Sequence, residues 1–221
     1  MTRFDAVLFD LDGTLCRRTQ DTDAVFAAAF DRAGTAPFGE PDDLWAALDG
    51  PPDPDDRVGY LGAGFARLAA QHGRTADPLA LAEAFVAGVD NTQVELTPGA
   101  DRALDAAAAA GATAILTNGP TDRQATKVDA LGLADRLDAV VYAGDHPRRK
   151  PHAAPFERTL AALDVPAARA LYVGDSLAYD VAGAHTAGLA AAWLADDGAD
   201  PAPYDPEFVL DSLADLPEVL G

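Results

Sequence analysis

The sequence is 221 residues long, with 49% hydrophobic and 24% charged residues, which suits one or two globular domains with a sizeable core. It carries 16 Lys and Arg against 36 Asp and Glu. The resulting net charge of -20 disfavours binding to nucleic acid or to an anionic membrane. No stretch resembles a signal peptide or a membrane span, and the single cysteine, Cys16, excludes an intrachain disulfide. These features predict a cytoplasmic protein.

The acidic excess has two explanations. A high-GC genome favours Ala, Arg and Asp, and so enriches some of the residues that are common here. A halophilic host favours an acidic surface, because salt screens the repulsion between like charges. Since base composition does not require an excess of acid over base, we predict a halophilic protein.

The first predicted element is a buried strand over residues 6–9, where an apolar run shows no helical period. From about residue 20 to 92 the apolar residues recur at helical spacing, and no segment reads convincingly as a strand. Residues 17–92 are therefore predicted to form an inserted, all-helical domain. Its helices are expected over residues 25–33, 41–48, 55–71 and 78–89.

Helices and strands alternate from residue 100 onward. Strands are predicted over 112–116, 139–142, 170–173, 189–194 and 207–210, and helices over 100–110, 122–131, 154–163 and 177–187, before a short final helix. This alternation implies right-handed crossovers and a parallel sheet. Residues 1–16 and 93–221 are thus predicted to form a doubly wound, Rossmann-like α/β core. Sites in such sheets lie beyond the carboxyl ends of the strands.

The segment Phe9-Asp10-Leu11-Asp12-Gly13-Thr14 ends the first predicted strand. Asp10 and Asp12 point the same way in an extended chain, so each raises the cost of ionising the other. A divalent cation such as Mg²⁺ prefers oxygen ligands and would relieve this repulsion. Gly13 permits a sharp turn, and its amide could approach a phosphate group. Taken alone, an ordinary Asp-Gly turn explains the segment about equally well.

Three further groups of polar residues follow the next predicted strands. Thr117 and Asn118 offer a hydroxyl and amides to a phosphate oxygen, although a helix N-cap and turn explains them better when they are taken alone. Lys150, one of only two lysines, supplies a point cation suited to a phosphoryl group or an aspartyl nucleophile. Asp175 can ligate a metal, and Asp180, about one and a half turns into the next helix, can orient the ligands.

Together and in this order, the four motifs resemble those of the haloacid dehalogenase superfamily of phosphohydrolases, over residues 5 to about 195. The helical insertion resembles the cap of that family's phosphatase branch. The resemblance implies that Asp10 is the nucleophile and forms an aspartyl-phosphate. It implies that Asp12 protonates the leaving alcohol and then activates water.

The resemblance also assigns the remaining motif residues. It implies that Thr117 and the Asn118 amide hold phosphate oxygens, and that Lys150 offsets negative charge. It implies a Mg²⁺ ion held by Asp10, the Asp12 backbone carbonyl and Asp175, with Asp180 in support. The expected protein is a Mg²⁺-dependent phosphatase of a small phosphorylated metabolite, either a monomer or a homodimer.

Three alternatives remain open from the sequence. A hydrolytic 2-haloacid dehalogenase would use Asp10 but would need neither Asp12 nor Asp175. A phosphosugar mutase would need a cap that excludes water. A non-catalytic binding domain is disfavoured because every catalytic position is retained. The family's acidic-serine pair after the first motif is replaced by Cys16-Arg17-Arg18, which weakens assignment to phosphoglycolate phosphatases. Arg17 and Arg18 are expected in a solvated hinge rather than on substrate.

Overall fold

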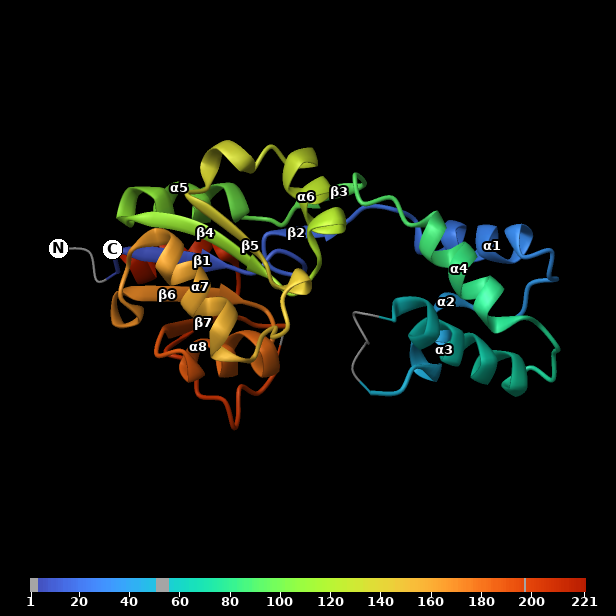
Figure 1. The fold of residues 1–221 in the computed structure, drawn as a ribbon. Coiled ribbons are helices and arrows are strands. Elements are labelled where there is room, and N and C mark those ends of the chain that lie inside the picture. The colour runs from blue at the N-terminus through green and yellow to red at the C-terminus, as the bar shows by residue number, and fades with distance from the viewer. Residues whose placement is uncertain (1–3, 51–55, 197) are drawn as a thin grey trace. The chain divides into compact units, whose positions relative to one another are not determined.

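The computed structural model describes residues 4–50, 56–196 and 198–221. The chain forms two compact units: residues 1–18 with 91–221, and residues 19–90 (Figure 1). The first unit contains a sheet flanked by helices, and the second contains helices. These units divide the chain two residues away from the boundaries predicted from the sequence.

A six-stranded parallel sheet forms the centre of the first unit, in the order β5-β4-β1-β6-β7-β8. Its strands are β1 (Ala6–Phe9), β4 (Ala112–Thr117), β5 (Ala139–Tyr142), β6 (Ala170–Gly174), β7 (Ala190–Leu194) and β8 (Phe208–Leu210). Every residue of β1 is buried, as expected for a central strand covered on both faces. Phe9 pairs with Ile115 on one side and Val173 on the other, so β1, β4 and β6 end close together.

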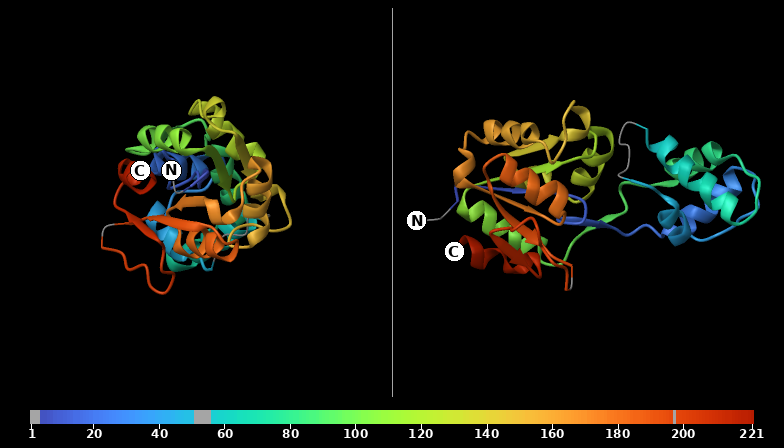
Figure 2. Two further views of the ribbon diagram at one scale, coloured as in Figure 1. Left: turned by 90° about the vertical axis from the view of Figure 1, so that its left-hand side faces the viewer. Right: turned by 90° about the horizontal axis from the view of Figure 1, so that it is seen from below.

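Helices cover both faces of this sheet, as Figure 2 shows. One apolar cluster joins the sheet to α5 (Ala100–Ala110), α6 (Thr121–Ala130) and α9 (Leu216–Leu220). Another joins the opposite face to α7 (Ala153–Leu163) and α8 (Ala182–Thr186). Short 3₁₀ turns lie at Ala134–Arg136, Ala143–Asp145, Ala167–Arg169 and Leu213–Asp215. The predicted doubly wound α/β fold is therefore confirmed.

A short antiparallel ribbon was not predicted from the sequence. It pairs β2 (Cys16–Arg18) with β3 (Val94–Leu96), next to the two points where the chain passes between the units. The Arg17 guanidinium lies 2.7 Å from a carboxylate oxygen of Glu95. Arg18 donates to Asn91 Oδ1 at 3.1 Å. The sequence pattern missed both strands because they are three residues long and contain charged residues, so neither forms an apolar run.

The second unit contains α1 (Thr22–Arg32), α2 (Pro41–Ala47), α3 (Arg57–Gln71) and α4 (Pro78–Gly88). Residue 55, where the third helix was expected to begin, lies outside the described residues. Phenylalanines at the centre pack edge to face, with Phe30 against both Phe26 and Phe38. The Gln20 side chain joins the two ends of the unit. It donates to the Gly88 carbonyl at 2.8 Å and accepts from the Asp90 amide at 2.9 Å.

The helix predicted over 177–187 begins differently from the expectation. Leu177–Val181 forms a π-helical turn, and α8 follows it directly. The wider turn lets the Asp180 carboxylate reach back and accept from the Ser176 amide at 2.9 Å. Among residues 4–50, 56–196 and 198–221, no helix combines the length and the apolar character needed to cross a membrane.

Candidate active site

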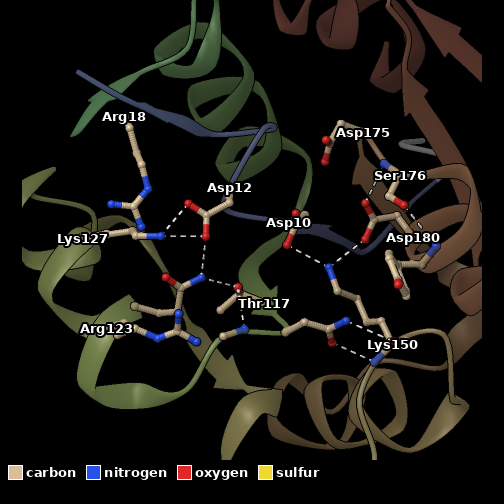
Figure 3. A pocket seen from close by; sticks show the side chains of 14 residues that line it. Asp10, Asp12, Arg18, Thr117, Arg123, Lys127, Lys150, Asp175, Ser176 and Asp180 are labelled. Carbon is tan, nitrogen blue, oxygen red and sulfur yellow. Dashed lines mark hydrogen bonds and ion pairs between the residues drawn. The ribbon is translucent and has the colours of Figure 1, made fainter. Parts of the chain in front are cut away.

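The predicted motif residues gather at the carboxyl end of the sheet. Asp10 follows β1, Thr117 ends β4, and Asp175 follows β6, while Lys150 lies in the loop before α7. With Asp180 they line a pocket of about 300 Å³ (Figure 3). The side chains come from segments up to 170 residues apart in sequence, because parallel strands bring their carboxyl ends to one edge.

Lys150 occupies the buried side of this pocket and is 4% exposed. Its Nζ lies 2.8 Å from Asp10 Oδ1 and 2.7 Å from Asp180 Oδ1. It also donates to the Tyr172 hydroxyl at 2.8 Å, and that hydroxyl donates in turn to the Leu116 carbonyl at 2.9 Å. A buried ammonium group costs free energy unless all its protons have partners, and these three partners satisfy it.

Burial is the main influence on the ionisation of this group of residues. It raises the pKa of Asp10 to about 7, and the neighbouring Asp180 carboxylate adds to the increase although Lys150 opposes it. Burial also raises the pKa of Asp175, again with a contribution from Asp180. For Lys150, burial disfavours the charged form, but the two carboxylates outweigh it and raise the pKa.

The donor set here suits a hard divalent cation. Asp10, Asp175 and Asp180 each offer a carboxylate oxygen, and these oxygens lie within 4.8 Å of one another. Three ionised carboxylates and one ammonium leave a net charge of -2, which a divalent cation would neutralise. Asp180 already uses one oxygen for Lys150 and the other for the Ser176 amide. Asp10 and Asp175 are therefore the better direct ligands, with Asp180 holding the surroundings in place.

The orientation of Asp175 is fixed by two hydrogen bonds. Thr14 Oγ1 donates to its Oδ1 at 3.2 Å, and Trp193 Nε1 donates to its backbone carbonyl at 2.8 Å. Gly13 makes this approach possible, because it has φ of +85° and a Cβ there would lie 2.5 Å from Asp175 Oδ2. Gly174 has a similar function, since a Cβ on it would lie 2.4 Å from the Asp180 side chain.

These pKa shifts predict a pH-dependent stabilisation by Mg²⁺. The raised pKa of Asp10 means that its proton stabilises the fold below about pH 4, and that this contribution is lost as the pH rises through 7. Below pH 7, Mg²⁺ must displace the Asp10 proton in order to bind. Above pH 7, Asp10 is already ionised and can bind Mg²⁺ directly. We expect saturating Mg²⁺ to raise Tm by roughly 5–10 °C at pH 8 and by far less at pH 5.

Thermal melts at both pH values, with Mg²⁺ or with NaCl of equal ionic strength, check this prediction. The NaCl series is necessary because a chain of net charge -20 gains stability from any added salt. In Asp175→Asn, the effect of Mg²⁺ should fall to that of NaCl. An equal effect of the two salts on the wild-type protein would contradict a specific cation site.

Asp12 lies beside this group of residues but faces different partners. Lys127 Nζ lies 2.6 and 2.7 Å from its two carboxylate oxygens, and Gln124 Nε2 donates to Oδ2 at 2.8 Å. Burial opposes ionisation of Asp12, but Lys127 outweighs it and lowers the pKa of this carboxyl. The Asp12 side chain therefore faces Lys127 and Gln124, and its backbone carbonyl is left for the predicted metal contact.

Thr117 and Asn118 lie between these two groups of residues. Thr117 Oγ1 accepts from Gln124 Nε2 at 2.6 Å and from the Gly119 amide at 3.3 Å. The Asn118 side chain accepts from the Lys150 amide at 2.8 Å and donates to the Lys150 carbonyl at 3.0 Å. Asn118 thus holds the backbone that carries Lys150.

The structure brings the predicted site residues together, and all except Gly13, which lies against Asp175, line the pocket. The Gly13 amide, expected to approach a phosphate group, donates to the Cys16 carbonyl at 2.9 Å in this structure. Sequence reasoning gave no function to Tyr172, Gln124 or Lys127. Of these, Lys127 alone gave a signal, as one of only two lysines. Arg18 lines the pocket, whereas a solvated hinge had been the preferred interpretation.

The chain is similar to known proteins over most of its length. The family model of haloacid dehalogenase-like hydrolases matches residues 4–188. A ribulose-1,5-bisphosphate 5-phosphatase from Halopiger xanaduensis is 32% identical over 200 residues, which cover 83% of this chain and 82% of the relative. A phosphoglycolate phosphatase from Cereibacter sphaeroides is 33% identical over 194 residues, which cover 83% of this chain and 81% of the relative. The crystal structure of a predicted phosphoglycolate phosphatase from Haemophilus somnus covers 100% of both chains with a TM-score of 0.76 and 24% identity.

The chain therefore belongs to the haloacid dehalogenase-like hydrolases. The predictions of this superfamily, of its phosphatase branch and of an enzyme that hydrolyses phosphoric monoesters are confirmed. Phosphoglycolate phosphatases are among the relatives of this chain, although Cys16-Arg17-Arg18 replaces the family's acidic-serine pair.

Proposed function

We propose that the protein is a Mg²⁺-dependent phosphatase that hydrolyses a small phosphorylated metabolite through an aspartyl-phosphate on Asp10. The observation that carries the proposal is the position of Asp10. Its buried carboxylate lies 2.8 Å from the Lys150 ammonium and within 4.8 Å of the Asp175 and Asp180 oxygens. Lys150 supplies one cation beside this carboxylate, and a divalent cation held by Asp10 and Asp175 would supply a second, so that both offset the charge of an anionic phosphorus centre.

The charges around the pocket support an anionic substrate. Four of the chain's 16 basic residues line it: Arg18, Arg123, Lys127 and Lys150. Four aspartates line the same pocket, so its side-chain charges balance in a protein with a net charge of -20. A divalent cation held there would make the pocket positive, which favours phosphate over neutral ligands. The pocket volume of about 300 Å³ suits a small molecule.

The reaction divides into two displacements. Asp10 attacks phosphorus and displaces the alcohol oxygen, which takes a proton from Asp12. Water then attacks the aspartyl-phosphate while Asp12 accepts a proton, which releases inorganic phosphate and restores Asp10. Lys150 stabilises the negative charge that develops near Asp10, and the Thr117 hydroxyl and Asn118 amide hold phosphate oxygens. When bound by Asp10, Asp175 and the Asp12 carbonyl, Mg²⁺ supplies Lewis-acid stabilisation of phosphoryl charge.

The ionisation of Asp12 fits both of its functions in this scheme. Its low pKa keeps the resting carboxyl in the base form, which the second displacement needs. A bound phosphate dianion places like charge beside Asp12 and raises its pKa, which favours the acid form in the first displacement. A 2-haloacid dehalogenase needs no such proton donor, so Asp12 and its partners favour the phosphatase.

The helical unit of residues 19–90 is the proposed cap. Its insertion between β2 and β3 leaves the motif residues in the other unit, so the chemistry and the selection of substrate can lie on separate parts of the chain. Closure of a cap would exclude water from the site during the first displacement.

Hydrolysis of p-nitrophenyl phosphate tests the proposed function. We expect turnover with Mg²⁺, loss of turnover with EDTA, and recovery when Mg²⁺ is added back. Asp175→Asn should need much more Mg²⁺ for the same rate. Halide release from 2-chloropropionate, measured in parallel, should stay at background. Halide release without phosphatase activity would overturn the proposal in favour of a dehalogenase.

A further inference from the structure

Two polar side chains on α6 are buried against the active site. Gln124 and Lys127 are 3% and 2% exposed, and their spacing of three residues puts them on the same face of the helix. Lysine is rarely this buried without a partner of opposite charge. The partner here is Asp12, whose two oxygens lie 2.6 and 2.7 Å from Lys127 Nζ.

The chain's only two lysines lie on opposite sides of the two aspartates of the first motif (Figure 3). Lys150 contacts Asp10, the proposed nucleophile, and Lys127 contacts Asp12, the proposed acid and base. Asp10 and Asp12 therefore have different ion-pair partners although they lie only two residues apart in the sequence.

Gln124 connects Asp12 to Thr117, whose hydroxyl is proposed to hold a phosphate oxygen. An ionised carboxylate only accepts hydrogen bonds, so the side of Gln124 that faces Asp12 must be its NH₂ group. That nitrogen donates to Asp12 Oδ2 at 2.8 Å and to Thr117 Oγ1 at 2.6 Å. With the Gly119 amide as a second donor, both lone pairs of Thr117 Oγ1 are used. The Thr117 hydroxyl hydrogen is therefore free to donate to an oxygen in the pocket.

We propose that Gln124 and Lys127 are positioning residues for the phosphatase reaction. Lys127 fixes the Asp12 carboxylate where it exchanges protons with the leaving group and with water. Gln124 fixes the Thr117 hydroxyl as a hydrogen-bond donor to the phosphate group. This inference rests on the proposed function. The new element is the function of α6, which carries none of the four motifs but sets the geometry of two of them.

A double-mutant cycle tests Lys127. Lys127→Met should lower kcat for p-nitrophenyl phosphate about 10- to 100-fold with little change in KM, because Asp12 is no longer held for proton transfer. In an Asp12→Asn background, the same change should lower the rate constant measured by single turnover less than threefold, since Lys127 acts through Asp12. A merely structural loss would be equal in both backgrounds and would overturn the proposal.

The test of Gln124 measures affinity rather than rate. Gln124→Leu should weaken binding of inorganic phosphate about tenfold by calorimetry and raise KM, because the Thr117 hydroxyl loses its fixed orientation. In a Thr117→Val background it should weaken phosphate binding no further. A similar loss of affinity in both backgrounds would contradict the proposed function of Gln124.

Controls separate positioning from folding and from the reaction itself. Asp129→Asn changes an exposed residue on the same helix and should leave kcat and KM within twofold. If Lys127→Met does not fold, Lys127→Gln, which keeps a donor, takes its place in the cycle. A wild-type protein that neither hydrolyses phosphate esters nor binds phosphate would overturn the proposed function. Additive effects in an active protein would overturn the positioning proposal alone.

Discussion

Asp10→Asn is expected to lower kcat for phosphate esters by about 10⁴-fold or more while the fold stays intact. The amide keeps the shape of the carboxylate, and its oxygen can still accept from Lys150, but it cannot attack phosphorus. At pH 8 without Mg²⁺ the variant should melt at the same temperature as the wild-type protein or higher. The reason is that the pKa of about 7 makes an ionised Asp10 unfavourable to the fold, and an asparagine carries no charge.

Steady-state kinetics and thermal melts of the two proteins check this expectation. Added Mg²⁺ should stabilise the wild-type protein more than Asp10→Asn, because the variant has lost one anionic ligand. Beryllium fluoride, which mimics an aspartyl-phosphate, should bind the wild-type protein and not the variant. Substantial turnover by Asp10→Asn would contradict the aspartyl-phosphate mechanism, whereas a loss of folding would show that the carboxylate itself is structural.

Lys150→Met is expected to damage both stability and activity. The change leaves Asp10 and Asp180 without their shared cation in a buried position, which typically costs about 3–5 kcal/mol of unfolding free energy. It also removes the charge proposed to stabilise the phosphoryl group, so kcat should fall roughly 10²- to 10³-fold. Urea unfolding and kinetics measure the two losses separately, and Mg²⁺ should restore part of the stability but little of the rate.

Lys127→Met is the matched control for this variant. It removes the other buried lysine, but its partner Asp12 has a side chain 46% exposed, so water can solvate the carboxylate that is left. Its loss of unfolding free energy should therefore be clearly smaller than that of Lys150→Met. Equal losses would show that the stability of the site does not depend on how deeply the carboxylates are buried.

The sequence predicts where the carboxylates of the pocket and Lys150 lie because the rule that places them is simple. Short apolar strands of a parallel sheet end at one edge, and the polar residues that follow them must lie there together. Asp10 and Asp175 follow strands whose residues are all buried, which makes these strands easy to find in the sequence. Their carboxylate oxygens lie within 4.8 Å of each other although the residues are 165 positions apart, which follows from this topology rather than from any local signal.

The interactions that the sequence does not reveal all depend on where side chains meet in space. Tyr172 lies within an apolar strand and reads as a core residue, yet its hydroxyl contacts Lys150. Gln124 and Lys127 lie in a helix rich in polar residues, where helical spacing alone does not separate an exposed face from one that is buried against a carboxylate. The π-helical turn before α8 accompanies the hydrogen bond from the Ser176 amide to the Asp180 carboxylate, which local propensity does not encode.

The two hydrogen bonds of the Gln20 side chain have a consequence for how the helical unit can change during evolution. One side chain ties Gly88 and Asp90, at the exit of the helical unit, to its entry, so the inserted segment begins and ends at one place. A segment whose ends meet can be replaced by another of different length without changing the order of the sheet strands. Descendants of an ancestral enzyme could therefore exchange residues 19–90, the proposed cap, while Asp10, Lys150 and Asp175 were inherited unchanged.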